Sequence, residues 1–275
     1  MAYNSHQRQV TVIDQLGRQV TFPYPPLRIV SLVPSQTELL FDLGLRKQVV
    51  GVTKFCIYPS YARHSAAIIG GTKNFDFDKI KAARPDLIIG NKEENYEQGI
   101  KQLEQRYPVW LSDIASLPDA LLMIRKLGNI TGKAHLAEPL AAEINNSFTA
   151  LPSTNSAISA AYFIWRKPYM VAAGGTFIDD MLGRAGFRNV FASLGRYPEI
   201  TPAQLRAAAP ERIFLSSEPY PFGAKHLAEF QEICPAAKIH VVDGELFSWY
   251  GSRLRQSPAY FQQLYSSQSR PRPPR

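Results

Sequence analysis

Two distant stretches of this chain carry nearly the same residue pattern, and this repeat limits the folds that the chain can adopt. The first is residues 80–89, IKAARPDLII, and the second is residues 205–214, LRAAAPERIF. In each, an alanine-rich helical pattern stops at a proline followed by an acid, and an apolar strand then begins. The helix stops there because proline disfavours the α conformation for the residue before it. A repeated unit of helix end, stop and strand predicts two similar lobes.

The order of elements around the two copies is also repeated. An apolar strand and a helix that ends at a glycine precede each copy, as Arg28–Val33 with Gly44 and as Ala161–Trp165 with Gly186. One more apolar strand follows each copy, at residues 109–111 and 239–242. Because strands alternate with helical patterns, we expect a parallel βαβ sheet in each lobe.

The length of 275 residues suits two domains. We predict an α/β protein with two Rossmann-like parallel-sheet lobes, joined by one long helix, and a ligand cleft between them. The predicted segments are an N-terminal lobe (1–127, with a hairpin over 10–22), a linking helix (128–155), a C-terminal lobe (156–265) and a disordered tail (266–275). Pro139 would be either a kink in the linking helix or the first turn of a second helix.

Composition and charge exclude several classes of protein. Apolar residues at 45% and charged residues at 20% are ordinary for a globular protein. The net charge of +8 suggests nucleic-acid binding, but it is scattered without a basic stripe, so we expect no nucleic-acid partner. No apolar run reaches the roughly 18–20 residues of a membrane-spanning helix. The start has no pattern of an export signal, so we expect a cytoplasmic monomer, or a periplasmic one if an upstream signal is missing.

Motifs for catalysis or metal binding are not found. The sequence has no GxSxG or HExxH motif and no histidine cluster, so we predict no catalytic residue, no metal ion bound by side chains and no intrinsic cofactor. Cys56 and Cys234 fall in different lobes without ligand spacing. Free buried thiols are favoured over a disulfide or a metal pair.

The ligand is expected at the carboxyl ends of the strands, where open α/β sheets bind ligands. In the first lobe, Ser35 and Glu38 follow the first strand at capping-box spacing. Tyr58 lies in the next loop, and Glu93 and Glu94 follow the strand that ends at Ile89. The carboxylates are equally consistent with the solvated start of a helix.

The corresponding loops of the second lobe are rich in aromatic residues and arginine. A single aromatic residue belongs to the core more often than to a ligand site, but four loops of one predicted edge carry Trp, Tyr or Arg. Planar rings and guanidinium donors suit a bulky, partly apolar ligand with carboxylate, amide or phosphate groups. The predicted ligand-binding residues of both lobes are Tyr58, Trp165, Arg166, Tyr197, Glu218, Trp249, Tyr250 and Arg253.

These motifs resemble a family of substrate-binding proteins with a helical backbone, which serve ABC importers of cobalamin, haem and ferric siderophores. Residues 28–39 look like the opening strand and helix of its cobalamin-binding members, and Arg84–Ile88 looks like its helix-to-strand signature. The resemblance implies two α/β lobes joined by one helix, and a non-catalytic receptor. The implied ligand is cobalamin or another metal chelate.

The resemblance also implies roles for individual residues. Tyr197, Trp249 and Tyr250 match positions that wall the ligand in the family. The family docks its permease through one exposed acid on each lobe. In the first lobe the matching residue is Asp78, whereas Ala203 stands at the matching position of the second lobe and Glu199 is the nearest acid. Ligand binding is therefore better supported than engagement of an ABC importer permease.

An alternative from another class is a cytosolic enzyme or chaperone that handles a metal cofactor. Its candidate acids and bases would be Glu93, Glu94 and Glu218, provided that they are buried and converge on a pocket.

Overall fold

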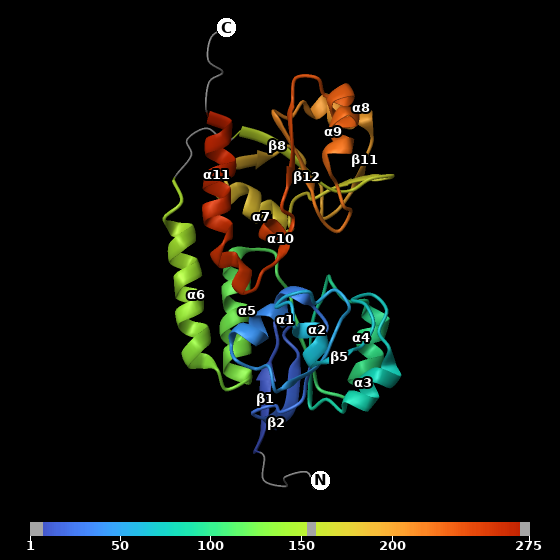
Figure 1. The fold of residues 1–275 in the computed structure, drawn as a ribbon, viewed down its shortest axis with the longest axis vertical. Helices are drawn as coiled ribbons and strands as arrows, with labels where there is room; N and C mark the ends of the chain where they lie inside the picture. The colour runs from blue at the N-terminus through green and yellow to red at the C-terminus, as the bar shows by residue number, and fades with distance from the viewer. Residues whose placement is uncertain (1–7, 153–157, 270–275) are drawn as a thin grey trace. The chain divides into compact units, whose positions relative to one another are not determined.

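The computed structural model describes residues 8–152 and 158–269, which form two compact units (Figure 1). The first unit comprises residues up to 114, residues 118–144 and residues 250–253. The second comprises residues 115–117, 145–249 and the chain from 254 onward. The chain therefore returns to the first unit for four residues late in the sequence. The predicted segment boundaries stay a prediction.

The first unit contains a hairpin and a parallel sheet. Strands β1 (Arg8–Ile13) and β2 (Gln19–Tyr24) pair antiparallel, which confirms the predicted hairpin. The sheet has five parallel strands in the order β5-β4-β3-β6-β7. Their bounds are β3 Ile29–Ser31, β4 Val49–Val52, β5 Ala67–Ile68, β6 Leu87–Asn91 and β7 Val109–Ser112.

Four helices of the first unit connect these strands, and a fifth, α5, follows β7. They are α1 (Pro34–Asp42), α2 (Ala62–Ser65), α3 (Phe77–Ala83), α4 (Glu97–Glu104) and α5, which runs from Leu117 to Ile130. Helices α3 and α4 cover one face of the sheet, where Ile80 and Leu103 pack with Val30, Ile88 and Leu111 in one buried cluster (Figure 1).

The sheet of the second unit is mixed rather than fully parallel. Its order is β11-β9-β8-β12-β13, with β10 also paired to β8. Strands β8, β12 and β13 are parallel as predicted, and β10 is also parallel to β8, but β9 and β11 pair antiparallel at one edge. Their bounds are β8 Ile158–Trp165, β9 Tyr169–Val171, β10 Phe187–Asn189, β11 Glu199–Ile200, β12 Arg212–Ser216 and β13 Lys238–Val242.

Helices cover both faces of this second sheet. Successive residues of β12 point to opposite faces, as expected for a buried strand. Ile213 belongs to the cluster that includes Phe230, whereas Phe214 contacts Phe187 and Phe247 on the other face. The helices are α7 (Phe177–Arg184), α8 (Pro202–Ala208), α9 (Leu227–Ile233), α10 (Glu245–Ser248) and α11 (Ser257–Ser269), with short 3₁₀ turns η1 (Ala224–His226) and η2 (Ser252–Arg255).

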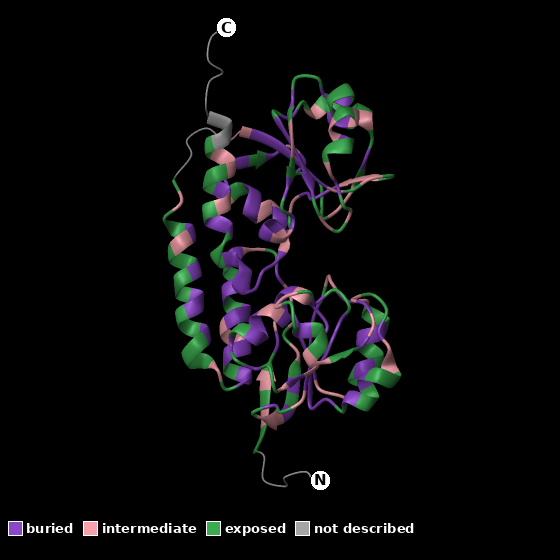
Figure 2. Cartoon of the chain, viewed as in Figure 1, coloured by how far each residue is buried: buried purple, intermediate pink, exposed green. Residues whose placement is uncertain are grey.

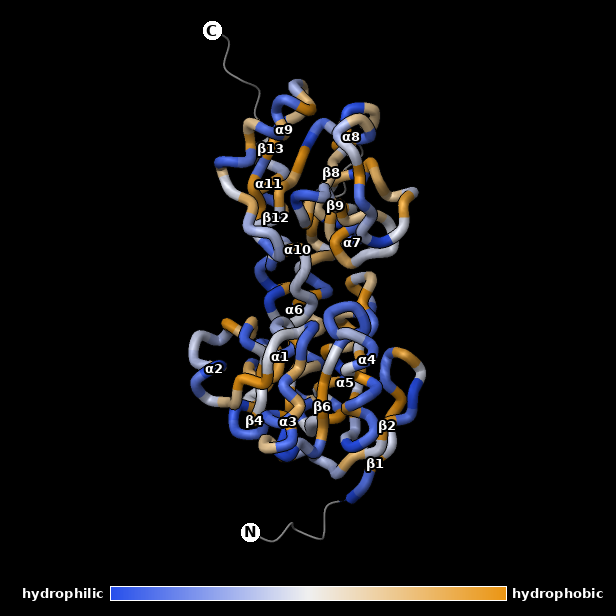
Figure 3. Tube along the Cα trace, turned by 90° about the vertical axis from the view of Figure 1, so that its right-hand side faces the viewer, coloured by the Kyte–Doolittle hydropathy of each residue, from blue (hydrophilic) through white to orange (hydrophobic). Residues whose placement is uncertain are grey.

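Buried residues follow the strands of both units. Figure 2 shows the central strands in the colour of buried residues, and Figure 3 shows that apolar stretches of the trace run through each unit while hydrophilic stretches dominate the outer loops. All five residues of β6 and all five of β12 are buried. Each unit therefore has its own core, which the length of the chain allows.

The segment between the lobes differs from the predicted single helix over 128–155. Helix α5 ends at Ile130, Gly132 adopts a positive φ of 71°, and α6 (Ala134–Thr149) comes next. Gly132 provides the left-handed conformation that ends a helix at low cost. Pro139 lies inside α6. The end of the predicted linking helix and most of the predicted tail lie outside the described residues, at 153–157 and 270–275. Helix α11 continues to Ser269 and so includes the start of the predicted tail.

The repeat in the sequence is confirmed in both units. Arg84 follows the last residue of α3 and Ala209 follows the last residue of α8, and both C-cap residues are left-handed, with φ of 45° and 42°. A proline and an acid come after each, and then β6 and β12 begin. The proline prevents the helix from continuing, so the chain turns into the sheet at the same point of each copy.

The acid after each proline fixes the start of the neighbouring strand. The Asp86 carboxylate accepts hydrogen bonds from the backbone N–H of Leu27 (2.8 Å) and Arg28 (2.9 Å), just before β3. The Glu211 carboxylate accepts from the backbone N–H (2.8 Å) and the hydroxyl (2.9 Å) of Ser159 in β8. Burial raises the pKa of Asp86, against the effect of its hydrogen bonds, whereas the hydrogen bonds from Ser159 lower the pKa of Glu211.

Removing these carboxylates should destabilise the two units unequally. We expect Asp86→Ala to lower the free energy of unfolding by about 2–3 kcal/mol, because removal of the buried carboxylate leaves two backbone N–H groups without their acceptor. Glu211→Ala should cost only about 1 kcal/mol, since Glu211 is exposed and water replaces the acceptor. Urea unfolding followed by circular dichroism measures both.

The exposed Gln98 of α4 provides the control, since Gln98→Ala should change the unfolding free energy by no more than about 0.5 kcal/mol. An Asp86→Ala protein as stable as the wild type would show that Asp86 does not stabilise the start of β3.

Candidate functional site

The first candidate region is the edge of the first unit where β3, β4, β6 and β7 end. Helix α1 begins here with Pro34 at its first position, and its N-cap is Val33, without a side-chain cap. The predicted capping box of Ser35 and Glu38 is therefore wrong. Proline suits the first helical position because it has no N–H to satisfy, and it places Ser35 inside the helix rather than at its cap.

One face of α1 instead receives the returning segment Tyr250–Arg253, which belongs to the first unit. The hydroxyl of Ser252 donates a hydrogen bond to Asp42. A Cβ atom added to Gly251 would lie 2.4 Å from the carbonyl oxygen of Ser35, so only glycine allows this approach. The α1 residues Ser35, Glu38 and Asp42 lie on one face of the helix, because they are spaced three and four residues apart.

Arg253 forms a bidentate ion pair with Glu38 of α1. Its guanidinium donates to both carboxylate oxygens of Glu38, from Nε (3.0 Å) and from Nη2 (2.7 Å). Its Cζ lies 3.8 Å from the centre of the Tyr58 ring, so the cation stacks on the aromatic face. Burial raises the pKa of Glu38, although the hydrogen bonds and charge of Arg253 oppose this effect. The structure thus brings together Tyr58, Arg253 and Glu38.

A buried polar layer supports this edge from below. Gln36 donates to the hydroxyl of Ser112 at the end of β7 (2.5 Å), and Asn91 at the end of β6 donates to the same hydroxyl (2.9 Å). The hydroxyl of Thr37 lies 3.1 Å from the sulfur of Cys56. Such networks fix the ends of buried strands. Cys56 and Cys234 are free and buried, as predicted, and burial raises the pKa of both thiols.

The carboxylates after β6 are half-buried. The backbone N–H groups of Glu93 and Glu94 donate to the side-chain oxygen of Asn91, which forms the turn after the strand (2.8 and 3.1 Å). The turn therefore orients both residues at the strand-end edge of the first unit.

The second unit has its own group of polar and aromatic residues at the strand ends. After β12, one carboxylate oxygen of Glu218 accepts from the hydroxyl of Ser248 (2.8 Å) and from the indole N–H of Trp249 (2.9 Å). Gly244 makes this contact possible, because a Cβ there would lie 2.4 Å from the Ser216 hydroxyl and 2.7 Å from the Glu218 side chain. Trp249 is thereby fixed by a charged acceptor.

A second cluster lies after β8. Arg166 pairs with Glu229 on α9 (Nε to oxygen 2.8 Å), and the Tyr169 hydroxyl donates to the same carboxylate. Burial, followed by the effects of Glu229, raises the pKa of Tyr169 to about 12. Trp165 is 40% exposed and packs edge-on against Tyr220, with ring centres 5.6 Å apart. An exposed indole at a strand end provides a flat apolar surface to a ligand.

The other predicted residues lie at positions consistent with surface or loop roles. Tyr197 is half-buried in the loop before β11, and Tyr250 is buried in the returning segment. Asp78 is exposed in the first turn of α3, Glu199 is exposed in β11, and Ala203 is exposed in α8.

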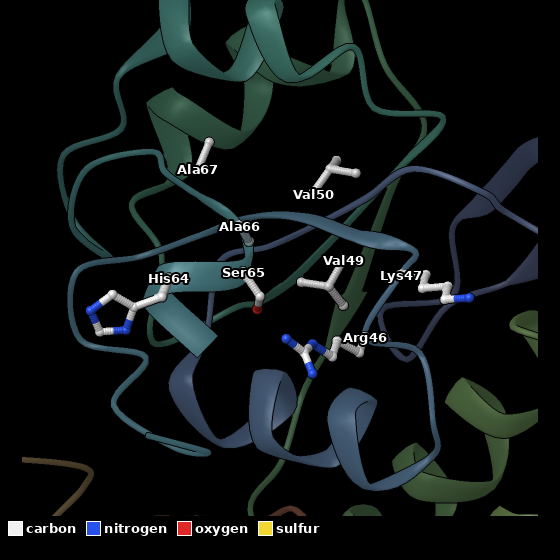
Figure 4. Close-up of a pocket in the computed structure, with 8 residues that line it drawn as sticks. All are labelled: Arg46, Lys47, Val49, Val50, His64, Ser65, Ala66 and Ala67. Carbon is white, nitrogen blue, oxygen red and sulfur yellow. The ribbon is translucent and has the colours of Figure 1, made fainter. Parts of the chain in front are cut away.

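A separate hollow of about 500 Å³ lies at the amino ends of β4 and β5, away from the strand-end edge of the first unit. Figure 4 shows Arg46 and Ser65 turned toward one another across it, with His64 and Lys47 at its two ends. The Arg46 guanidinium stacks on Tyr61, 4.7 Å from the ring centre. None of the predicted ligand-binding residues lines this hollow.

Within the described residues, no three His, Cys, Asp or Glu side chains gather where they could hold a metal ion. The helices between residues 8 and 152 and between 158 and 269 are all too short or too polar to cross a lipid bilayer.

Comparison with known families decides the class of the protein. Residues 29–238 match the family model described as periplasmic binding protein, and this range contains both copies of the repeat. The chain belongs to the periplasmic binding protein family. Its members are binding proteins rather than enzymes.

Relatives and solved structures agree with the family. The chain is 26% identical over 197 residues to the vitamin B12-binding protein of Vibrio campbellii (strain ATCC BAA-1116), covering 70% of this chain and 71% of that protein. It shares the fold of the periplasmic heme-binding protein from Roseiflexus sp. RS-1 (TM-score 0.76, 23% identity, 87% and 98% covered). It also shares the fold of the periplasmic vitamin B12 binding protein of Vibrio cholerae (TM-score 0.74, 22% identity, 90% and 100% covered).

The family corrects one expectation. The predicted cytoplasmic location was wrong, because the chain belongs to a family of periplasmic binding proteins. That prediction used only the residue pattern at the start of the sequence. The family match covers residues 29–238 and is the stronger evidence for location. The alternative, a periplasmic location, agrees with the family.

Sequence reasoning missed several residues of the two clusters. Glu229, Tyr169 and Tyr220 surround Arg166 and Trp165 but were not among the predicted residues. Glu38 was assigned to a helix cap, although it pairs with Arg253. The available signal was that a buried or half-buried arginine requires a carboxylate partner, but the identity of that partner depends on the fold.

The contact between Glu218 and Trp249 is testable by NMR. Glu218→Ala should move the indole N–H resonance of Trp249 upfield, because the indole loses a charged acceptor, and should lower the unfolding free energy by about 1–2 kcal/mol. The chain has only three tryptophans, and Trp249→Phe assigns the signal. Glu232→Ala, at an exposed position of α9, is the matched control. An unmoved Trp249 resonance in Glu218→Ala would contradict the contact.

Proposed function

We propose that this protein is a monomeric, non-catalytic receptor for a chelated-metal complex of the corrinoid, haem or ferric siderophore class, and that it delivers this ligand to an ABC importer. Membership of the periplasmic binding protein family supports the receptor role. The vitamin B12-binding relative and the haem-binding and vitamin B12-binding proteins of the same fold support a macrocyclic metal complex as the ligand.

The observation that supports this ligand class best is the same in both units. At the strand ends of each, an arginine is paired with a glutamate beside aromatic rings, as Arg253 with Glu38 and as Arg166 with Glu229. Aromatic faces suit a macrocycle, and charge-compensated polar groups suit its side groups. We propose that the ligand-contacting residues are Tyr58, Trp165, Arg166, Tyr197, Glu218, Trp249, Tyr250 and Arg253.

Isothermal titration with cobalamin, cobinamide, haem and ferric siderophores tests the function. At least one should bind in the micromolar range or tighter, and the absence of binding by all of them would overturn the proposal. Trp165→Ala should raise the Kd of the bound ligand about tenfold, because an exposed stacking surface worth about 1.4 kcal/mol is lost. Leu122→Ala removes a similarly exposed apolar side chain on α5 and should leave the Kd unchanged.

We propose that docking to the permease uses Asp78 on the first unit and Glu199 on the second, both of which are exposed. Asp78→Lys should weaken binding to the importer in nanodiscs about tenfold, because it reverses a charge at the interface, while the ligand Kd stays constant. Ala203→Glu should strengthen docking by restoring an acid. Glu97→Lys on α4 is the charge-reversal control. Equal binding of all variants to the importer would show that these acids do not take part in docking.

A further inference from the structure

The ion pair of Glu38 and Arg253 decides which polar groups the first unit can accept. Arg253 donates from Nε and Nη2 to both oxygens of Glu38, so one of the two edges of the guanidinium that could hold a ligand carboxylate is occupied. Both side chains are largely covered, at 9% and 13% exposure. The Tyr58 ring covers one face of the guanidinium. A cation that is neutralised in this way does not provide a net positive charge.

The pair is held from both sides. On the segment of Arg253, Ser252 donates to Asp42 and Gly251 packs on the carbonyl of Ser35, so the backbone of the segment is fixed to α1. Glu38 lies on the same face of α1, one turn from each of these contacts. Arg253 cannot turn toward a ligand carboxylate without breaking two hydrogen bonds to a mostly buried acid, and that loss is unfavourable.

The other charges at this edge of the first unit are of both signs. Lys92 at the end of β6 pairs with Asp113 (2.7 Å). Glu93 and Glu94 add two carboxylates in the next turn. Lys54 in the loop after β4 lies over the Phe55 ring (5.1 Å), and Lys73 after β5 donates to the backbone carbonyl of Glu93. Because these charges include both acids and bases, the selectivity of this edge depends on the state of Arg253.

We propose that the first unit accepts an uncharged polar rim of the ligand, and that Glu38 is the residue that sets this selectivity by keeping Arg253 charge-compensated. The inference rests on the proposed receptor function. An amide or hydroxamate oxygen accepts a hydrogen bond without bringing a charge next to Glu38, whereas a carboxylate must either displace Glu38 or lie beside it. The preferred ligands are metal chelates with amide side groups, and those with free carboxylates are disfavoured.

Pairs of ligands that share a macrocycle but differ in the charge of their side groups separate the effect of charge from the effect of shape. Cobinamide is compared with cobyrinic acid, which has carboxylates in place of amides on the same corrin, and haem dimethyl ester is compared with haem. For each scaffold that binds, calorimetry yields the ratio of the carboxylate Kd to the uncharged Kd. We expect this ratio to be about 10 or more for the wild type.

Two substitutions should move the ratio in opposite directions. Glu38→Gln keeps the shape of the side chain but removes its charge, so Arg253 becomes available to a carboxylate and the ratio should fall about tenfold. Arg253→Gln leaves the acid without its cation, so the ratio should rise. Glu138→Gln removes a glutamate from a similar pair with Arg125 on an exposed surface and should not change the ratio. Circular dichroism confirms that each variant is folded.

The outcomes separate this inference from the function on which it rests. A ratio near 1 in the wild type, or the same ratio in the wild type and Glu38→Gln, overturns the selectivity role of Glu38 while the receptor function stands. The absence of binding by both members of every pair, and by the siderophores, overturns the receptor function and this inference with it. Opposite shifts in the two variants support the proposal.

Discussion

The hydrogen bonds from the start of each central strand to the acid after the proline align the strand pair at the centre of each sheet. Asp86 accepts from two backbone N–H groups just before β3, and Glu211 accepts from Ser159 in β8. A buried N–H without an acceptor is costly, so each contact favours one alignment of the two strands. That alignment pairs Ile29 with Leu87 and Ala160 with Arg212, and it therefore sets where the strands end and where their loops emerge.

The loops at those strand ends are built differently in the two units. In the first unit, the polar contacts use one face of α1 and a segment from far along the chain, which contributes Arg253. In the second unit, Glu229 of α9 fixes Arg166, and Glu218 fixes Trp249. Both arrangements place rings next to charge-compensated groups. The two units thus share the scaffold and the pairing of an arginine with a glutamate beside aromatic rings. The helices and loops that contribute these residues differ between the units.

The sequence predicted the scaffold well because its signals are local. A proline and an acid after an alanine-rich helix, followed by an apolar run, indicate a helix stop and a buried strand without any knowledge of distant contacts. Strands β9 and β11 escaped prediction because they are only three and two residues long, too short for a periodic pattern. The pairings of Arg253 with Glu38 and of Arg166 with Glu229 could not be predicted, since they join residues 215 and 63 positions apart. The spacing of Ser35 and Glu38 was misleading, because Pro34 begins the helix and Glu38 has a more favourable partner.

The return of residues 250–253 to the first unit also bears on how the protein is made. During synthesis, every strand of both sheets leaves the ribosome before Arg253 does, since β13 ends at Val242. The N-terminal unit therefore emerges first but completes its strand-end edge last, and until then Glu38 is an acid without its cation. A fragment cut within α6 would contain the sheet of the first unit but not its arginine. The N-terminal unit is thus synthesised first, but its strand-end edge is complete only after the strands of the second unit have been synthesised.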